Sequence, residues 1–233
     1  MREDDGVYAV VTGVHSNAEN GVVCTGADAG LIPELVGWFR SAGVPASWLC
    51  AEGSDLNAAL LAAGCHAERS AWEMRARVDE LNLDAPDDPG IHIERVRSDE
   101  ALSSWLTIAA ENGWFDDADS KEAARRLYAD LILGKTALLR LYLAFDNGAP
   151  VAMASAFLEK PIALLTGLAV QPHARRRGVG RLLALARLRD ARNLGCDLTV
   201  LAPSPDGGKL YRTLGFEQHQ QPADRWFYLP TSD

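Results

Sequence analysis

An arginine-rich stretch with two spaced glycines is the part of this sequence best suited to hold a charged ligand. It runs from Leu168 to Arg181 and reads Leu-Ala-Val-Gln-Pro-His-Ala-Arg-Arg-Arg-Gly-Val-Gly-Arg. The pattern predicts a strand, a loop and then a helix that opens at Gly180. Backbone N–H groups at such a junction converge where the helix dipole favours negative charge. Glycine leaves room for close approach, and arginine donates ionic hydrogen bonds to phosphate oxygens. The stretch therefore predicts a pyrophosphate site.

Two common phosphate-binding motifs do not fit this stretch. A P-loop requires Gly-Lys-Ser/Thr, whereas this chain has Gly180-Arg181-Leu182. A dinucleotide fingerprint needs a third glycine where Leu183 stands, and it usually opens the first βαβ unit instead of lying late in the chain. The pyrophosphate therefore belongs to another kind of ligand.

Composition narrows the class of protein. The chain has 233 residues, which is long enough for one large or two small domains, and 48% of them are hydrophobic and 24% charged. A net charge of −9 argues against a nucleic-acid partner and favours a cationic or amine substrate. No apolar run has membrane-spanning length and the start is acidic, so we expect a cytoplasmic protein with no membrane partner. Four cysteines lack metal-ligand spacing, so we expect reduced thiols and no metal: Cys24, Cys50, Cys65 and Cys196.

Hydrophobic periodicity predicts alternating strands and helices in the first part of the chain. The expected strands are Val7–Thr12, Gly21–Thr25, Pro45–Ala51 and His66–Val78, and the expected helices are Leu31–Ala42 and Asp55–Ala63. The segment Asn82–Gly90 is rich in Asp and Pro, as a linker is. We therefore predict two domains, at 1–82 and 91–233.

The part of the chain after the linker also alternates between expected strands and helices, and it contains more of them. A strong Asn-Gly turn signal at Asn147-Gly148 predicts a hairpin. We expect the last strand, Trp226–Leu229, to complete this second sheet. The other expected strands are His92–Arg97, Leu139–Phe145, Val151–Leu158, Ile162–Val170, Leu198–Leu201 and Phe216–Gln218, and the expected helices are Asp99–Asn112, Ser120–Leu133, one ending at Leu194, and Asp206–Leu214. The fold class is α/β (α+β), a mixed central sheet flanked by helices.

This order of elements, with two motifs, resembles the GNAT superfamily of acyl-CoA-dependent N-acetyltransferases. The first motif is Val170-x-Pro172…Arg175-x-x-Gly178-x-Gly180, which is similar to the pyrophosphate loop of that family. The second is Tyr211-x-x-x-Gly215-Phe216, similar to the end of the family's last helix. They lie about 30 residues apart, the spacing that a βαβα unit needs. The resemblance covers roughly residues 91–229.

The resemblance implies acetyl-CoA as acyl donor. It implies that the main chain of Leu168, Ala169 and Val170 binds the pantetheine arm like an added strand, and that Tyr211 lies near the thioester sulfur. Ser204 stands where many relatives have an Asn that contacts the cofactor, and Gly207 where they often have Ala. The residues that would hold the pyrophosphate are Arg175, Arg176, Arg177, Gly178, Val179, Gly180 and Arg181.

The chemistry of such a transfer makes few demands on side chains. A neutral amine attacks the thioester carbonyl, and a phenol with an ordinary pKa near ~10 stays protonated and can protonate the departing thiolate, so Tyr211 is the candidate general acid. N–H groups at the end of the Leu168–Val170 strand would stabilise the oxyanion. Candidates for the base are Glu159, Glu111 and His173, and the sequence does not choose among them.

The acceptor of the acyl group is a small-molecule amine in this interpretation. The acidic and aromatic stretch Glu111–Asp119, which includes Trp114 and Asp116, lies where relatives shape the acceptor site, so we expect it to meet a cationic amine. Two other functions stay open: a non-catalytic CoA-binding sensor, and a transferase that takes its acyl group from a carrier-protein thioester.

An internal comparison interprets residues 1–82 as a smaller, degenerate GNAT-like domain in tandem with the catalytic one. The segment from Ser47 to His66 echoes the segment from Leu198 to Glu217. Aligning Gly64 with Gly215 places Leu60 where Tyr211 stands. The earlier segment also lacks the arginines and the Gly-x-Gly loop, so we expect a structural role for it.

Overall fold

The computed structural model of the protein describes residues 2–4, 7–16, 19–24, 29–51, 54–69, 73–84, 90–115, 117–133, 138–218 and 224–230. Its described residues fall into two compact units. Unit 1 contains those of 1–70, 115–124 and 220–233, and unit 2 contains those of 71–114 and 125–219.

Unit 1 is a six-stranded sheet with the order β1-β2-β3-β4-β13-β5. Two helices, α1 (Ile32–Ala42) and α2 (Asp55–Ala62), pack on it, and a 3-10 turn, η1 (Ala29–Leu31), leads into α1. Its core includes Phe39, Trp48 and Phe227, all buried. The strands are β1 (Arg2–Asp4), β2 (Val7–Val10), β3 (Gly21–Cys24), β4 (Ala46–Ala51), β5 (His66–Arg69) and β13 (Asp224–Leu229).

Unit 2 is a seven-stranded sheet with the order β12-β6-β11-β10-β9-β8-β7. The pairs are antiparallel except β10 and β11, which run parallel. The strands are β6 (Met74–Arg77), β7 (Ile91–Arg95), β8 (Leu139–Asp146), β9 (Ala149–Glu159), β10 (Ile162–Val170), β11 (Leu198–Leu201) and β12 (Glu217–Gln218).

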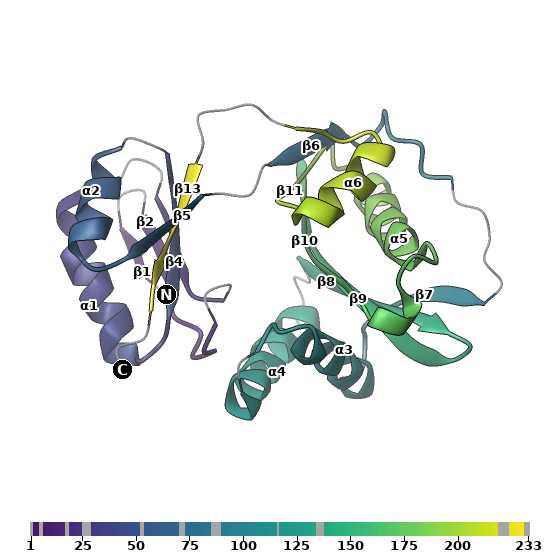
Figure 1. Ribbon diagram of the computed structural model, residues 1–233, viewed down its shortest axis with the longest axis horizontal. Helices are drawn as coiled ribbons and strands as arrows, with labels where there is room; N and C mark the ends of the chain where they lie inside the picture. Colours follow the sequence, from purple (N-terminus) through teal and green to yellow (C-terminus); the bar gives the residue numbers. More distant parts are fainter. Residues whose placement is uncertain are drawn as a thin grey trace. The chain divides into compact units, whose positions relative to one another are not determined.

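Helices cover both faces of the sheet in unit 2, which explains why β9 is almost wholly apolar. On one face lies α3 (Asp99–Glu111), whose Trp105 donates from Nε1 to the Ala154 carbonyl at 3.0 Å. On the other lies α5 (Val179–Leu194), which packs on β9 and β10 (Figure 1). The remaining helices are α4 (Ala118–Leu133), α6 (Pro205–Thr213) and the 3-10 turn η2 (Pro172–Ala174).

Two strand predictions were wrong. The stretch His66–Val78 is not one strand, because β5 lies in the sheet of unit 1 and β6 in the sheet of unit 2. The last strand, β13, does not complete the second sheet but pairs with β4 and β5. Figure 1 shows both by colour: yellow β13 runs among the early strands, and blue β6 runs beside green β11. Periodicity predicts that a segment is a strand, but pairing partners are chosen by contacts distant in sequence.

The mixed α/β fold and the predicted helices are confirmed, and their ends differ from prediction by at most two residues. Cys50, Cys65 and Cys196 are buried, as expected, while the side chain of Cys24 lies outside the described part. Within the described ranges, no helix combines the length and apolar character needed to cross a membrane.

Candidate active site

The candidate site begins where two parallel strands stop pairing. Among the described residues, β10 pairs with β11 only at Ile162, Ala163 and Leu164. On its other edge, β10 stays paired with β9 as far as Val170. In the second half of β10, the edge on the β11 side is therefore not paired with β11. An extended chain can add to such an edge by backbone hydrogen bonds. Leu168, Ala169 and Val170, predicted to contact pantetheine, lie on this half.

A bulge interrupts the same half of β10. The register with β9 shifts between Thr166 and Leu168, so Gly167 is the extra residue. Its φ is 37°, in the left-handed region that side chains disfavour. A Cβ at this position would also lie 1.9 Å from Cη2 of Trp114. Glycine is required here on both counts, and the ring of Trp114 lies directly against the bulge.

The predicted phosphate loop follows the strand as η2 and the start of α5. Arg176 and Gly178 have positive φ values of 65° and 82°. Gly178 is the N-cap of α5 and, as a glycine, has no side chain to accept from the first N–H groups of the helix. Left-handed residues in a tight turn can direct neighbouring N–H groups toward one concavity, which suits an anion.

The loop packs closely on the end of β10 and on α6. A Cβ built on Gly180 would meet Leu168, Leu210 and Val170 at 3.5, 3.7 and 3.7 Å. These distances are ordinary van der Waals contacts, so a methyl group fits there but a longer side chain does not. Gly180 thus marks the point where β10, the loop and α6 converge.

Hydrogen bonds tie two of the three loop arginines to the protein. Arg175 donates from Nε to the Val170 carbonyl at 2.9 Å and from Nη2 to Oδ1 of Asn112 at 3.3 Å. Arg177 pairs with Asp146 on β8, and this bond lowers the pKa of the Asp146 carboxyl. Arg176 has a different neighbour: its charge adds to the effect of Lys209 in lowering the pKa of Asp206. Arg175 and Arg177 therefore hold the loop to β8, to the end of β10 and to the end of α3, and the predicted binding of a pyrophosphate by this loop stays a prediction.

Tyr211 lies on α6 with its side chain buried, at 6% exposure. Its phenol oxygen accepts a hydrogen bond from Nη2 of Arg187 at 2.6 Å. Phe216 of the same motif meets the Tyr211 ring edge-on, with centroids 5.2 Å apart. Sequence reasoning missed Arg187. The available signal was an arginine on the stripe of α5 whose other members, such as Leu183, Leu188 and Ala191, are apolar core residues.

Ser204 begins α6 as its N-cap. Its Oγ accepts from the Gly207 N–H at 3.1 Å, which satisfies one of the helix's first amides. The capping role is a local reason for a serine at this position. The predicted contact of Ser204 with the cofactor stays a prediction.

The three candidate bases lie in different places. Glu111, at the end of α3, accepts a hydrogen bond from Gln171, just after β10. His173 is an exposed residue of η2. Glu159 ends β9 at the opposite end of β10 from the loop, about 16 Å of strand from the bulge at 3.3 Å per residue. Distance from the bulge thus disfavours Glu159.

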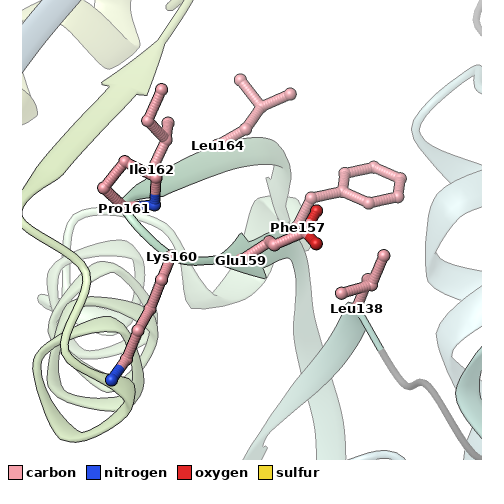
Figure 2. Close-up of a pocket in the computed structure, with 7 residues that line it drawn as sticks. All are labelled: Leu138, Phe157, Glu159, Lys160, Pro161, Ile162 and Leu164. Atoms are coloured by element: carbon pink, nitrogen blue, oxygen red, sulfur yellow. The ribbon is translucent and has the colours of Figure 1, made fainter.

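A hollow of about 360 Å³ lies beside Glu159 (Figure 2). Four apolar side chains give it most of its surface, and each is about two-fifths exposed: Leu138, Phe157, Ile162 and Leu164. Figure 2 shows the Lys160 side chain pointing away from this apolar group. The hollow surrounds the turn between β9 and β10, so it is separate from the loop and from Tyr211.

An aromatic group lies on the α3 side of the bulge. The ring of Trp105 meets Trp114 and Tyr128 edge-on, with centroid distances of 5.8 and 5.5 Å. Trp114 was predicted to shape the acceptor site, and it is half-buried against Gly167. Asp116, named with it, lies outside the described residues.

Comparisons with known proteins agree with this geometry. Residues 99–216 match the model of the family described as acetyltransferase (GNAT) family. None of the curated proteins compared matches the chain in sequence. Solved structures do match over nearly its full length, at identities that show the fold alone.

One is a GCN5-related N-acetyltransferase from Kribbella flavida, 20% identical, with a TM-score of 0.64 over 92% of this chain and 82% of that one. Another is a conserved protein of unknown function from Staphylococcus epidermidis, 13% identical, with a TM-score of 0.68 over 98% and 91%. A third is a tandem GNAT protein from the clavulanic acid biosynthesis pathway, 19% identical, with a TM-score of 0.61 over 89% and 73%.

The matched domain defines an acyltransferase. Because the family model spans just over half of the chain, the protein belongs to the GNAT acetyltransferase family.

Proposed function

We propose that the protein transfers an acetyl group from acetyl-CoA to the primary amine of a small molecule by direct attack, with Tyr211 as the general acid. The observation that carries the proposal is the meeting of three elements at the second half of β10: the strand edge that no described strand pairs with, the N-terminus of α5 with its glycine N-cap, and the Tyr211 hydroxyl, which Arg187 joins to the bulge. Acyl transfer from a long thioester needs all three in one place.

Each element has a separate task. The edge of β10 would bind the pantetheine arm, and the backbone from Arg175 to Arg181 would bind the pyrophosphate. Since Gly180 lies against Leu168 and Val170, the two tasks are coupled through direct packing. Holding the donor and the amine in one geometry is worth up to roughly 7–11 kcal/mol of the barrier in the best cases.

Tyr211 would complete the transfer by protonating sulfur. Its hydroxyl accepts from Arg187, so its own proton remains available for donation. General acid catalysis typically contributes about 10²–10⁴-fold to a rate. For the acceptor, the aromatic surface of Trp114 favours a flat or cationic group beside the reacting amine.

A thermal-shift titration with acetyl-CoA tests donor binding. A ligand that binds only the native state raises the unfolding midpoint by mass action. We expect a rise for the wild type and none for Gly180→Glu, whose side chain would enter the space between Leu168 and Leu210. Asn193→Glu is the matched control, because it places the same residue on the exposed far end of α5 and should respond like the wild type.

The rival functions give different results in the same assay. A CoA-binding sensor would show the midpoint shift but no amine-dependent release of free thiol. A carrier-dependent transferase would show little shift with acetyl-CoA and would release thiol only from an acylated carrier protein. Thiol release from free acetyl-CoA on addition of an amine supports the function proposed.

We also propose that unit 1 is a degenerate copy of the catalytic domain placed by sequence at 91–233. The element order β3-α1-β4-α2-β5 repeats β10-α5-β11-α6-β12, and each copy receives a strand from elsewhere in the chain, β13 or β6, beside β4 or β11. In unit 1, however, three of the four residues of β3 pair with β4, so little of its edge is left to bind a ligand. Calorimetry should therefore find one acetyl-CoA bound per chain, and two would contradict the proposal.

A further inference from the structure

Arg187 is a cation with complete burial, at 0% exposure, in the middle of α5. Its Nη1 donates to the carbonyls of Ser155 and Thr166, both at 3.0 Å, and of Gly167 at 3.3 Å. Its Nη2 donates to the phenol oxygen of Tyr211 at 2.6 Å. One side chain thus joins β9, the bulge of β10 and α6.

The partners of this cation are unusual for a buried charge. Its remaining hydrogen bond is from Nε to the Leu183 carbonyl of its own helix, so within the described residues every partner is a carbonyl or a hydroxyl and none is a carboxylate. Burying an ion without a counter-ion is costly, because neutral dipoles replace only part of its hydration. An apolar side chain would suit this position on α5 better if packing were its only task.

The contacts with Thr166 and Gly167 set the direction of the backbone at the bulge. In a regular strand, successive carbonyls point to opposite edges, but here two successive carbonyls accept from the same nitrogen. Each peptide unit is planar and trans, so its N–H points away from its carbonyl. The N–H groups of Gly167 and Leu168 therefore both point away from Arg187. Two adjacent N–H groups with one direction are the donors that an oxyanion requires.

The contact with Tyr211 sets the direction of the phenol. Because the oxygen accepts from Nη2, the hydroxyl proton is directed to another acceptor. The same guanidinium plane therefore fixes the position of the acid relative to the bulge. A planar fork of donors does this, whereas a single ammonium would reach only some of the acceptors.

We propose that Arg187 is the positioning residue of the transfer, which holds the acid Tyr211 and the N–H groups of Gly167 and Leu168 in register with each other. This inference rests on the proposed function. In the step it supports, the amine nitrogen bonds to the acyl carbon and the C–S bond breaks with its electron pair on sulfur. The Tyr211 proton moves to that sulfur, and the proton lost by the product ammonium returns through water to the phenolate. The positive charge of Arg187 stabilises the phenolate in between.

A double-mutant cycle tests the inference. The variants are Arg187→Lys, Arg187→Met, Tyr211→Phe and each double variant, assayed for thiol release with the amine that the wild type uses. We expect Arg187→Met to lower kcat by about 10²-fold, like loss of the acid itself. Arg187→Lys should recover only part of this, with KM for acetyl-CoA changed by less than threefold. In the Tyr211→Phe background, only the effect of Arg187 on the N–H groups of the bulge remains. Replacement of Arg187 should therefore lower kcat by a smaller factor there than in the wild type.

Arg189→Met is the matched control. Arg189 lies on the same helix and donates to the Leu83 carbonyl at 3.1 and 2.6 Å, and among the described residues the arginine of α5 that bonds Tyr211 is Arg187 instead. Arg189→Met should lower the unfolding midpoint. Its effect on kcat should simply add to the effect of Tyr211→Phe, with no coupling between the two. If the effects of Arg187 and Tyr211 on kcat are also fully additive, or if Arg187→Met keeps wild-type kcat, the inference is wrong.

Unfolding experiments keep the inference separate from the proposed function. If Arg187→Met does not fold, the double-mutant cycle is measured with Arg187→Lys. A midpoint shift of that variant with acetyl-CoA then shows that its binding site is intact. If the wild type releases no thiol with any amine but shifts with acetyl-CoA, the proposed function fails and the catalytic role of Arg187 fails with it. In that case, non-additive effects of Arg187→Lys and Tyr211→Phe on the unfolding midpoint would still show that the two side chains are in contact. If the wild type is active and the two changes are non-additive in the unfolding midpoint but additive in kcat, the inference is wrong and the proposed function stands.

Discussion

The ring of Trp114 lies where a side chain at position 167 would begin, with Cη2 only 1.9 Å from the place of a Cβ on Gly167. This relationship joins the segment after α3 to the bulge in β10. It puts an indole ring directly against the bulge whose backbone N–H groups we assign to the oxyanion.

Gly167→Ala should therefore be strongly destabilising. The methyl group overlaps the indole, and φ near 37° is unfavourable for alanine. We expect a lower unfolding midpoint and at least a tenfold loss of kcat. In the Trp114→Ala background the overlap is gone, so the same change should cost much less stability. An equal cost in both backgrounds would show that the ring is not the obstacle.

Trp114→Ala should raise the KM for the amine acceptor more than the KM for acetyl-CoA. The ring lies at the bulge, whereas the loop that we propose for the pyrophosphate of the donor begins beyond Val170. Steady-state kinetics with each substrate varied in turn measures the two effects. Trp38→Ala, in α1, removes a partly buried tryptophan of unit 1 and should change neither constant.

Tyr211→Phe removes the phenol hydroxyl and keeps the ring that packs on Phe216. We expect kcat to fall by about 10²-fold, because the thiolate must leave without a proton donor. The acetyl-CoA midpoint shift should stay close to that of the wild type. A variant with wild-type kcat would rule out the general acid and leave Tyr211 a packing residue.

The pair of Arg177 and Asp146 gives the protein a pH-dependent contribution to stability. Arg177 holds the pKa of the Asp146 carboxyl below its ordinary value, so the folded state binds that proton less tightly than the unfolded state. This stabilisation is present above about pH 4 and is lost as the pH falls through the lowered pKa. Asp146→Asn should thus lower the unfolding midpoint at pH 7, and its difference from the wild type should shrink as the pH falls below the ordinary pKa of an aspartate. If the folded state instead disfavoured the ionised carboxylate of Asp146, Asp146→Asn would raise the unfolding midpoint at pH 7.

Cys65 should be unreactive in the native protein. Burial raises the pKa of its thiol to about 11, so at pH 8 only about one molecule in 10³ is a thiolate. Alkylation with iodoacetamide, followed by peptide mass spectrometry, should label Cys65 in denaturant but not in buffer. Ser103→Cys places a thiol on the exposed face of α3 and is the positive control.

The sequence alone determined the local parts of the site. The strand, loop and helix around Arg175–Arg181 are set by glycine and by hydrophobic period, which act between near neighbours. The same is true of Tyr211 and Gly215, four residues apart at the end of α6. Arg175 and Arg177 lie in the predicted loop, where their guanidinium groups bind the Val170 carbonyl and the Asp146 carboxylate.

Only the tertiary structure decided which distant groups meet. By periodicity alone, the short strands β6 and β13 could each complete either sheet. In the structure, β6 pairs in the sheet of unit 2 and β13 pairs in the sheet of unit 1. The place of Arg187 on the apolar stripe of α5 indicates burial, but its partners are decided only when α5 packs against the bulge and α6, which places its guanidinium between Gly167 and Tyr211. Such contacts depend on long-range packing and burial, which no local pattern in the sequence encodes.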